Sequence, residues 1–218
     1  MVKIQAVKRR SLAVQVADAM RELIISGEYA QGEQLRQDDV AKKLGVSRIP
    51  VREAFQQLEA EGLVVNVPYK GAIVSRLTLD EINEYFDIRI ALEGDLLARA
   101  IDHMTPDAIS RARKIIDRMD SASPTKWGEI NWQLHAEIYA IAGRPITLEM
   151  VKKIHDNLDR YVRIQLSLSE DNRTRANKEH GRMIDLCEAG ETEQAVTLLR
   201  RHIDEARRDL IKHLQEND

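Results

Sequence analysis

Three histidines on separate helical stretches are the residues best suited to chemistry in this sequence. Asn131 and His135 are four residues apart and share one face of a predicted helix, and His180 and His202 each recur at helical spacing with aliphatic residues. Neutral imidazole ligates divalent metals of the Zn, Ni, Mn and Fe type, so three inward imidazoles that meet would form a metal site. An isolated inward histidine is more often a hydrogen-bonded core residue, and spacing along the chain does not show convergence.

Two arginines at the start of another predicted helix are suited to contact DNA. Arg48 and Arg52 are four residues apart and project from one face. Ser47 is a good N-cap residue, and Pro50 fits the first turn, where no backbone N–H is needed. A helix N-terminus holds phosphate through free N–H groups, and arginine grips guanine O6 and N7. The alternative is an ordinary solvated helix face.

Three short helices and a β-hairpin are predicted to position these arginines. A glycine lies at the end of each helix. After the third helix the spacing of apolar residues changes from the period of helices to that of strands, and Lys70 lies near the tip of the predicted hairpin. This order predicts a winged helix-turn-helix, preceded by a flexible basic arm over residues 1–10. The predicted elements are helices from Ser11 to Ser26, over 37–44 and over 48–61, and strands over 63–65 and 72–74.

The rest of the chain is predicted to be an all-α helical bundle that positions the histidines. No strand pattern follows Leu79, so the fold class is mainly α. We expect a DNA-binding domain over residues 1–78 and an effector-binding and dimerisation domain over 79–218, with no Gly/Ser-rich linker between them. The six predicted helices cover residues 79–102, 105–120, 126–142, 146–168, 172–189 and 191–215.

Composition and charge exclude several classes of protein. Apolar residues make up 43% of the 218 and aromatic residues 4%, which is too apolar for a disordered chain. Cys187 is the only cysteine, so no intrachain disulfide can form, and no apolar run reaches the length of a membrane span. We therefore expect a cytoplasmic protein with no membrane partner. The net charge of -3 divides into +3 over residues 1–78 and -6 over 79–218, which leaves a nucleic-acid partner open.

The front of the chain carries a dense set of family motifs. They include Leu44-Gly45-Val46-Ser47-Arg48, Pro50-Val51-Arg52-Glu53-Ala54 and Glu61-Gly62-Leu63. With these runs the stretch over residues 25–74 resembles the GntR family of bacterial transcription regulators. Ile49 departs from that family, where Thr is frequent, and it cannot donate a hydrogen bond to a phosphate. The resemblance implies that double-stranded operator DNA is the partner and that it is contacted by Arg36, Ser47, Arg48, Arg52, Lys70 and Gly71.

Sparser motifs follow in the helical half. In order they are Arg89-x-x-x-Glu93, Asn131-x-x-x-His135, Gly143-x-Pro145, Glu179-His180 and Arg201-His202-Ile203. With them residues 80–213 resemble the FCD-type ligand-binding domain of the FadR branch, in its VanR-like six-helix variant. The resemblance implies a divalent metal that helps to hold a small carboxylate effector. It places the metal ligands at Asn131, His135, His180 and His202.

Two residues of this set leave alternatives open. Asn131 stands where an Asp is usual in the family, and its carbonyl coordinates without negative charge. Either a weakly held metal depends on an anionic ligand, or the pocket works without metal. Arg89 pairs either with the effector carboxylate or with Glu93, four residues on. Glu179 is interpreted as a surface group or a group behind the ligands, and no role is assigned to His103, His155 and His213.

These observations favour a ligand-responsive repressor that binds two DNA half-sites as a homodimer. The alternatives are a regulator that senses the metal itself or works without an effector, and a metalloenzyme with a DNA-binding head. Three histidines would leave coordination positions open for hydrolysis. However, no HExxH-like motif occurs and no inward Glu or Asp beside the histidines is suited to act as a general base, so we expect no enzymatic activity.

Overall fold

The chain folds into two compact units, one ending at Arg76 and the other beginning at Leu77. A computed structural model describes residues 11–167 and 170–216, without the side chains of residues 124–125, 160, 163–167 and 170. The predicted basic arm and residue 168 of the fourth predicted bundle helix lie outside the described residues. Each unit has its own hydrophobic core.

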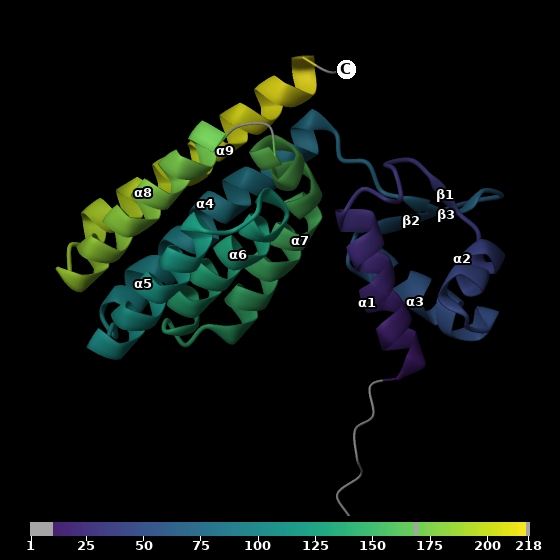
Figure 1. Ribbon diagram of the computed structural model, residues 1–218, viewed down its shortest axis with the longest axis horizontal. Helices are drawn as coiled ribbons and strands as arrows, with labels where there is room; N and C mark the ends of the chain where they lie inside the picture. The colour runs from purple at the N-terminus through teal and green to yellow at the C-terminus, as the bar shows by residue number, and fades with distance from the viewer. Residues whose placement is uncertain (1–10, 168–169, 217–218) are drawn as a thin grey trace, which may run out of the picture. The chain divides into compact units, whose positions relative to one another are not determined.

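The first unit contains three helices and a small antiparallel sheet with the strand order β1-β3-β2 (Figure 1). The predicted winged helix-turn-helix is confirmed. Strand β1 is an addition, because two residues are too few to produce a readable period; it pairs Gln34 with Ile73. The elements are α1 (Leu12–Ile25), β1 (Gln34–Leu35), α2 (Gln37–Leu44), α3 (Arg48–Ala60), β2 (Val64–Val67) and β3 (Gly71–Val74).

The turn between α2 and α3 determines which face of α3 is exposed. Gly45 ends α2 in the left-handed conformation (φ 66°), which only glycine adopts without strain. Helix α3 then buries Val51, Phe55 and Leu58 in the core of the unit and packs against α1. Because these positions recur at helical spacing, the opposite face of α3 is left to solvent.

The wing is the hairpin of β2 and β3. Val67 pairs with Gly71, so residues 68–70 form the tip. Tyr69 at this tip is fully exposed and has a φ of 65°, an uncommon conformation for a residue other than glycine. The side-chain amide of Gln34 donates to the backbone carbonyl of Lys70, which ties β1 to the tip.

The second unit is a bundle of six helices over its described residues (Figure 1). The predicted order and number of helices are confirmed, but some ends differ. Helices α6 and α7 begin at Pro124 and Pro145, before their predicted starts, because proline is favoured in a first helical turn. The helices are α4 (Leu79–Ile101), α5 (Pro106–Asp120), α6 (Pro124–Ala140), α7 (Pro145–Ser167), α8 (Glu170–Glu188) and α9 (Thr192–Glu216).

Helix α4 is the central element of the bundle. It packs against α6, α7 and α9, and its N-terminus is closed by a capping box in which Thr78 and Glu81 satisfy each other's backbone N–H groups. The core is aliphatic and aromatic, but polar side chains are also buried in the described part of the bundle: Arg89, Glu93, Asn131, His135, Asn157, Asp159 and His180. None of the described helices has an apolar stretch long enough to cross a bilayer.

Candidate functional site

The three histidines meet inside the bundle. His135 comes from α6, His180 from α8 and His202 from α9. The ring centroids are 5.2 Å apart for His135 and His180, 4.7 Å for His180 and His202, and 6.1 Å for His135 and His202. One nitrogen of each ring lies within 4.8 Å of the other two. Residues far apart in the sequence thus form one cluster of potential metal ligands.

Several buried polar atoms at this cluster lack a hydrogen-bond partner. Among the described residues these atoms are Nε2 of His135, both ring nitrogens of His180 and Oδ1 of Asn131. Buried polar atoms are nearly always paired, so several unpaired ones in one place are compatible with a bound ligand. Asn131 lies one helical turn before His135 and lines the same cavity as His202.

Glu179 fixes the ring orientation of His202. Its Oε2 lies 2.6 Å from Nδ1 of His202, and because a carboxylate only accepts, Nδ1 carries a proton and Nε2 is the nitrogen that a neutral ring would offer to a metal. Burial raises the pKa of Glu179, but the hydrogen bond and charge of His202, together with nearby arginines, more than offset this, so the pKa lies below its ordinary value. Glu179 therefore contacts the back of a potential metal ligand, His202, instead of the metal position itself. This is one of the two roles considered from sequence.

The other two histidines are held in the neutral form that ligates metals. Burial, followed by the neighbouring imidazoles, lowers the pKa of His135 well below its ordinary value. Burial and His202 do the same for the pKa of His180. Three imidazole nitrogens and one amide oxygen make a donor set that fits a borderline divalent cation, so the residues present are compatible with the metal implied by the resemblance.

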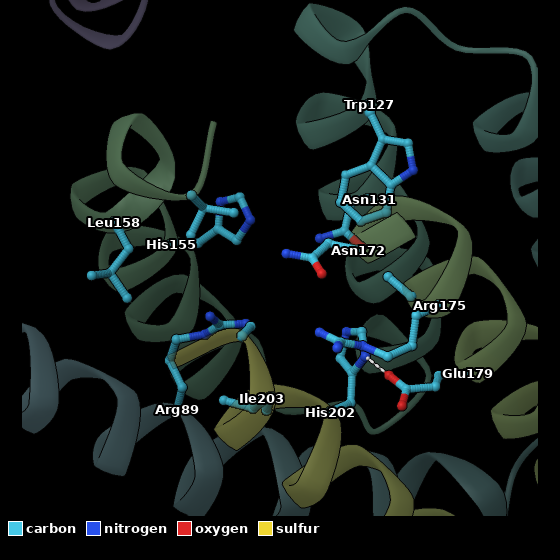
Figure 2. Close-up of a pocket in the computed structure, with 13 residues that line it drawn as sticks. Arg89, Trp127, Asn131, His155, Leu158, Asn172, Arg175, Glu179, His202 and Ile203 are labelled. Carbon is cyan, nitrogen blue, oxygen red and sulfur yellow. Dashed lines mark hydrogen bonds and ion pairs between the residues drawn. The ribbon is translucent and has the colours of Figure 1, made fainter. Parts of the chain in front are cut away.

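A cavity of about 50 Å³ adjoins the cluster (Figure 2). Arg89 lines it from α4 and is also paired with Glu93, at 2.6 Å between Nε and Oε1. The ion pair considered from sequence is thus present, and the same guanidinium faces the cavity. Arg175 lines the opposite side and is paired with Asp209 at 2.6 Å. Two guanidinium groups, each paired with a carboxylate, and the carboxylate of Glu179 therefore line the cavity.

The structure adds acidic residues to the site. Sequence analysis found no inward Glu or Asp suited as a general base, and the structure shows that Glu93 is 1% exposed and that Glu179 bonds His202. Tyr139 was missed, although its position four residues after His135 is a usable signal. His155, which was given no role, lines the cavity and packs its ring on Trp132 at 4.8 Å between centroids.

In the first unit, the residues expected to contact DNA are exposed. Arg48 and Arg52 lie at the start of α3, and Arg36 is the residue just before α2. Ser47 occupies the N-cap position with extended backbone, but its hydroxyl makes no capping hydrogen bond. Arg48 forms an ion pair with Asp38, in which both side chains remain mostly exposed.

Apolar and wing residues complete this exposed surface. Ile49, the departure from the family pattern, is 63% exposed in the first turn of α3. Lys70 and Gly71 are exposed on the wing. The α3 N-terminus and the wing are the parts of a winged helix-turn-helix that meet a major groove and the adjacent backbone.

A small winged helix-turn-helix unit, here called the reading head, followed by a helical bundle with a cavity lined by polar side chains is the architecture of a DNA-binding regulator. Residues 12–74 match the family described as "Bacterial regulatory proteins, gntR family", and residues 84–205 match the FCD domain. The chain belongs to the GntR family of transcription regulators, with an FCD domain as its second unit. Its family and its relatives are regulators, not enzymes.

Individual relatives agree with this assignment. The HTH-type transcriptional repressor GlaR of Escherichia coli (strain K12) is 28% identical over 192 residues, which cover 83% of this chain and 87% of GlaR. The HTH-type regulator YdhC of Bacillus subtilis (strain 168) is 29% identical over 109 residues, half of this chain. The match spans only 47% to 49% of the length of YdhC and three further curated relatives. The solved structure of E. coli McbR/YncC has the same fold, with a TM-score of 0.80 at 20% identity over 94% of this chain and 100% of that one.

Proposed function

We propose that this GntR-family regulator is a repressor whose operator affinity is set by a small carboxylate bound beside a divalent metal in the FCD bundle. The observation that carries the proposal is the cluster of unpaired lone pairs on Asn131, His135 and His180, with His202 beside them. Repressor activity is supported by the name of GlaR, which matches most of the chain.

The proposed metal ligands are Nε2 of His135, Nε2 of His202, a ring nitrogen of His180 and Oδ1 of Asn131. All four groups are neutral, so a bound dication would keep its full charge and supply electrostatic attraction for an anion. Arg89 would bind the other end of the same anion, because its guanidinium lines the cavity and offers donors beyond the one used by Glu93.

The proposed DNA-binding unit covers residues 1–78, and the proposed effector and dimerisation unit covers residues 79–218. One reading head covers too few base pairs for specificity, so we propose a homodimer on two half-sites. The effector would shift the population between dimer states whose heads are spaced differently. The residues proposed to contact operator DNA are Arg36, Ser47, Arg48, Arg52, Lys70 and Gly71.

Two other functions remain candidates: sensing of the metal itself, and DNA binding with an effector-free pocket. The guanidinium of Arg89 in the cavity favours a carboxylate effector over metal sensing, because a protein that senses only the metal has no need of a second cation there. The three proposals differ in which additions change operator affinity: metal with carboxylate, metal alone, or neither.

Ligand binding is tested by zinc titration of the chelator-treated full chain, with and without succinate as the probe carboxylate. We expect substoichiometric zinc in the purified protein and tighter zinc binding when succinate is added. His135→Ala should abolish this binding and leave DNA binding measurable, because it removes one ligand in the bundle and leaves the residues of the first unit unchanged. His103→Ala, at an exposed histidine, is the matched control and should bind zinc as the parent does. Identical titration curves for the parent and His135→Ala would overturn the proposal.

A further inference from the structure

A buried chain of hydrogen bonds joins the cavity arginine to the histidine cluster. Arg89 Nε donates to Glu93 Oε1 at 2.6 Å, and the Tyr139 hydroxyl donates to Glu93 Oε2 at 2.8 Å. The Tyr139 oxygen also lies 3.1 Å from Nδ1 of His135. None of the four residues is more than 8% exposed, so these bonds are shielded from bulk water. Helix α4 supplies the first two residues and α6 the other two.

The chemistry of each group fixes the direction of every bond in this chain. The Arg89 guanidinium only donates, and the carboxylate of Glu93 beside it only accepts. Tyr139 has one hydroxyl proton, which the bond to Glu93 uses. Toward His135 the Tyr139 oxygen can therefore only accept. Nδ1 of His135 must carry the ring proton, and Nε2 is left with its lone pair.

We infer that Tyr139, held by Glu93, is a positioning residue that keeps His135 in the tautomer whose Nε2 can ligate a metal. The inference rests on the proposed metal site. A neutral imidazole has two tautomers, and only the one protonated at Nδ1 presents a lone pair at Nε2. The partner of the non-ligating nitrogen sets this choice in metal sites generally, as Glu179 does for His202.

A merely structural role would have different consequences. If Tyr139 and Glu93 only satisfied each other's hydrogen bonds, loss of the hydroxyl would lower the stability of the bundle without changing the His135 tautomer or the affinity for zinc. The test therefore reads the tautomer and the affinity directly, and uses stability only as a check on folding.

The test compares Tyr139→Phe with the parent in the full chain. Tyr161→Phe is the matched control, because Tyr161 is also a buried tyrosine of the bundle and its hydroxyl accepts from the Leu77 N–H at 2.7 Å. The first readout is long-range ¹H–¹⁵N NMR of histidine-labelled, zinc-free protein, with His135 assigned from the signal lost in His135→Gln. The second is zinc affinity measured against a chromophoric chelator.

We expect His135 to be protonated at Nδ1 alone in the parent and in Tyr161→Phe, and to sample both tautomers in Tyr139→Phe. Zinc affinity of Tyr139→Phe should fall about 10- to 100-fold, the range found when such partners are removed. A parent His135 protonated at Nε2, or unchanged tautomer and zinc affinity in a folded Tyr139→Phe, would overturn the inference. If the parent binds no zinc, the proposed metal site is wrong, and the His135 tautomer then tests the inferred role of Tyr139 without the metal. If Tyr139→Phe does not fold, the His135 tautomer in the parent is the test: protonation at Nδ1 supports the inference, and protonation at Nε2 overturns it.

Discussion

Asn131 is the residue that distinguishes this cluster from one that would hold a metal tightly. Its Oδ1 is buried and unpaired, one turn from His135, so it is available as a ligand. An amide oxygen brings a dipole but no charge, and the other three proposed ligands are neutral imidazoles. The metal is therefore expected to depend on an anion from the cavity for part of its stabilisation.

Replacement of Asn131 tests this dependence in both directions. Asn131→Asp should tighten zinc binding at least tenfold, about 1.4 kcal/mol, because it adds a negative charge to the same position. It should also reduce the effect of succinate on zinc affinity. Asn131→Ala removes the oxygen and should weaken zinc binding. Chelator competition measures all three proteins, and equal affinities for the parent and Asn131→Asp would show that this side chain is not a ligand.

Arg52 is the corresponding single residue of the proposed DNA-binding surface. It is exposed in the first turns of α3, on the side opposite the buried face of that helix. Arg52→Ala should weaken operator binding at least tenfold, about 1.4 kcal/mol, through lost contacts with base edges or phosphate. Arg99→Ala, which removes an exposed arginine of the bundle, controls for the change in net charge. Fluorescence anisotropy with labelled operator measures the affinity of each protein. An affinity of Arg52→Ala close to that of the parent would contradict the proposal that this surface binds DNA.

At the scale of elements, apolar periodicity predicted most of the fold. The helices of both units and the hairpin followed from glycine, proline and apolar spacing, because these residues act locally. Strand β1 did not, since its two residues pair with a strand nearly forty positions later. Helix starts at Pro124 and Pro145 shifted for another local reason, the preference for proline in a first turn.

The site was predictable only in part. Helical spacing showed that His135, His180 and His202 face inward, but their convergence depends on how α6, α8 and α9 pack, and the family resemblance supplied it. Tyr139 was not recognised, and Glu93 was considered only as a partner of Arg89, because the bond between Glu93 and Tyr139 joins two helices whose packing the sequence does not show. The partners of ligands are thus harder to predict than the ligands themselves.

The capping box of α4 gives a prediction at this scale. Glu81 Oε2 accepts from the backbone N–H of Thr78 at 2.7 Å and from its hydroxyl at 2.9 Å, and these bonds lower the pKa of Glu81. A carboxyl whose folded pKa is depressed stabilises the fold above its unfolded pKa, and this contribution is lost as the pH falls through the folded value.

Glu81→Gln should therefore be less stable than the parent at neutral pH, by about 0.5 kcal/mol for a charge near an exposed helix N-terminus. The difference should shrink as the pH falls below the ordinary carboxyl range. Urea unfolding of the bundle at several pH values measures it. Glu84→Gln, at an exposed neighbour on the same helix, should follow the parent throughout. A gap that stayed constant with pH would mean that the charge of Glu81 contributes nothing.

In the whole molecule, the proposed mechanism couples the DNA-binding unit to the effector-binding bundle by thermodynamic linkage. A ligand can change DNA affinity only by the difference in its own affinity for the two states, and the operator must then change ligand affinity by the same factor. Couplings of this kind typically amount to about 1–3 kcal/mol, or roughly 5- to 150-fold. The proposed control of transcription is therefore a measurable binding quantity.

The most direct test is the operator affinity of the full chain in four conditions: free of metal, with zinc, with succinate, and with both. We predict that zinc and succinate together weaken operator binding by a factor of about 5 to 150, that each alone has a much smaller effect, and that His135→Ala is insensitive to both. Operator affinities that are identical in the four conditions, although zinc and succinate bind to the protein, would contradict the central claim.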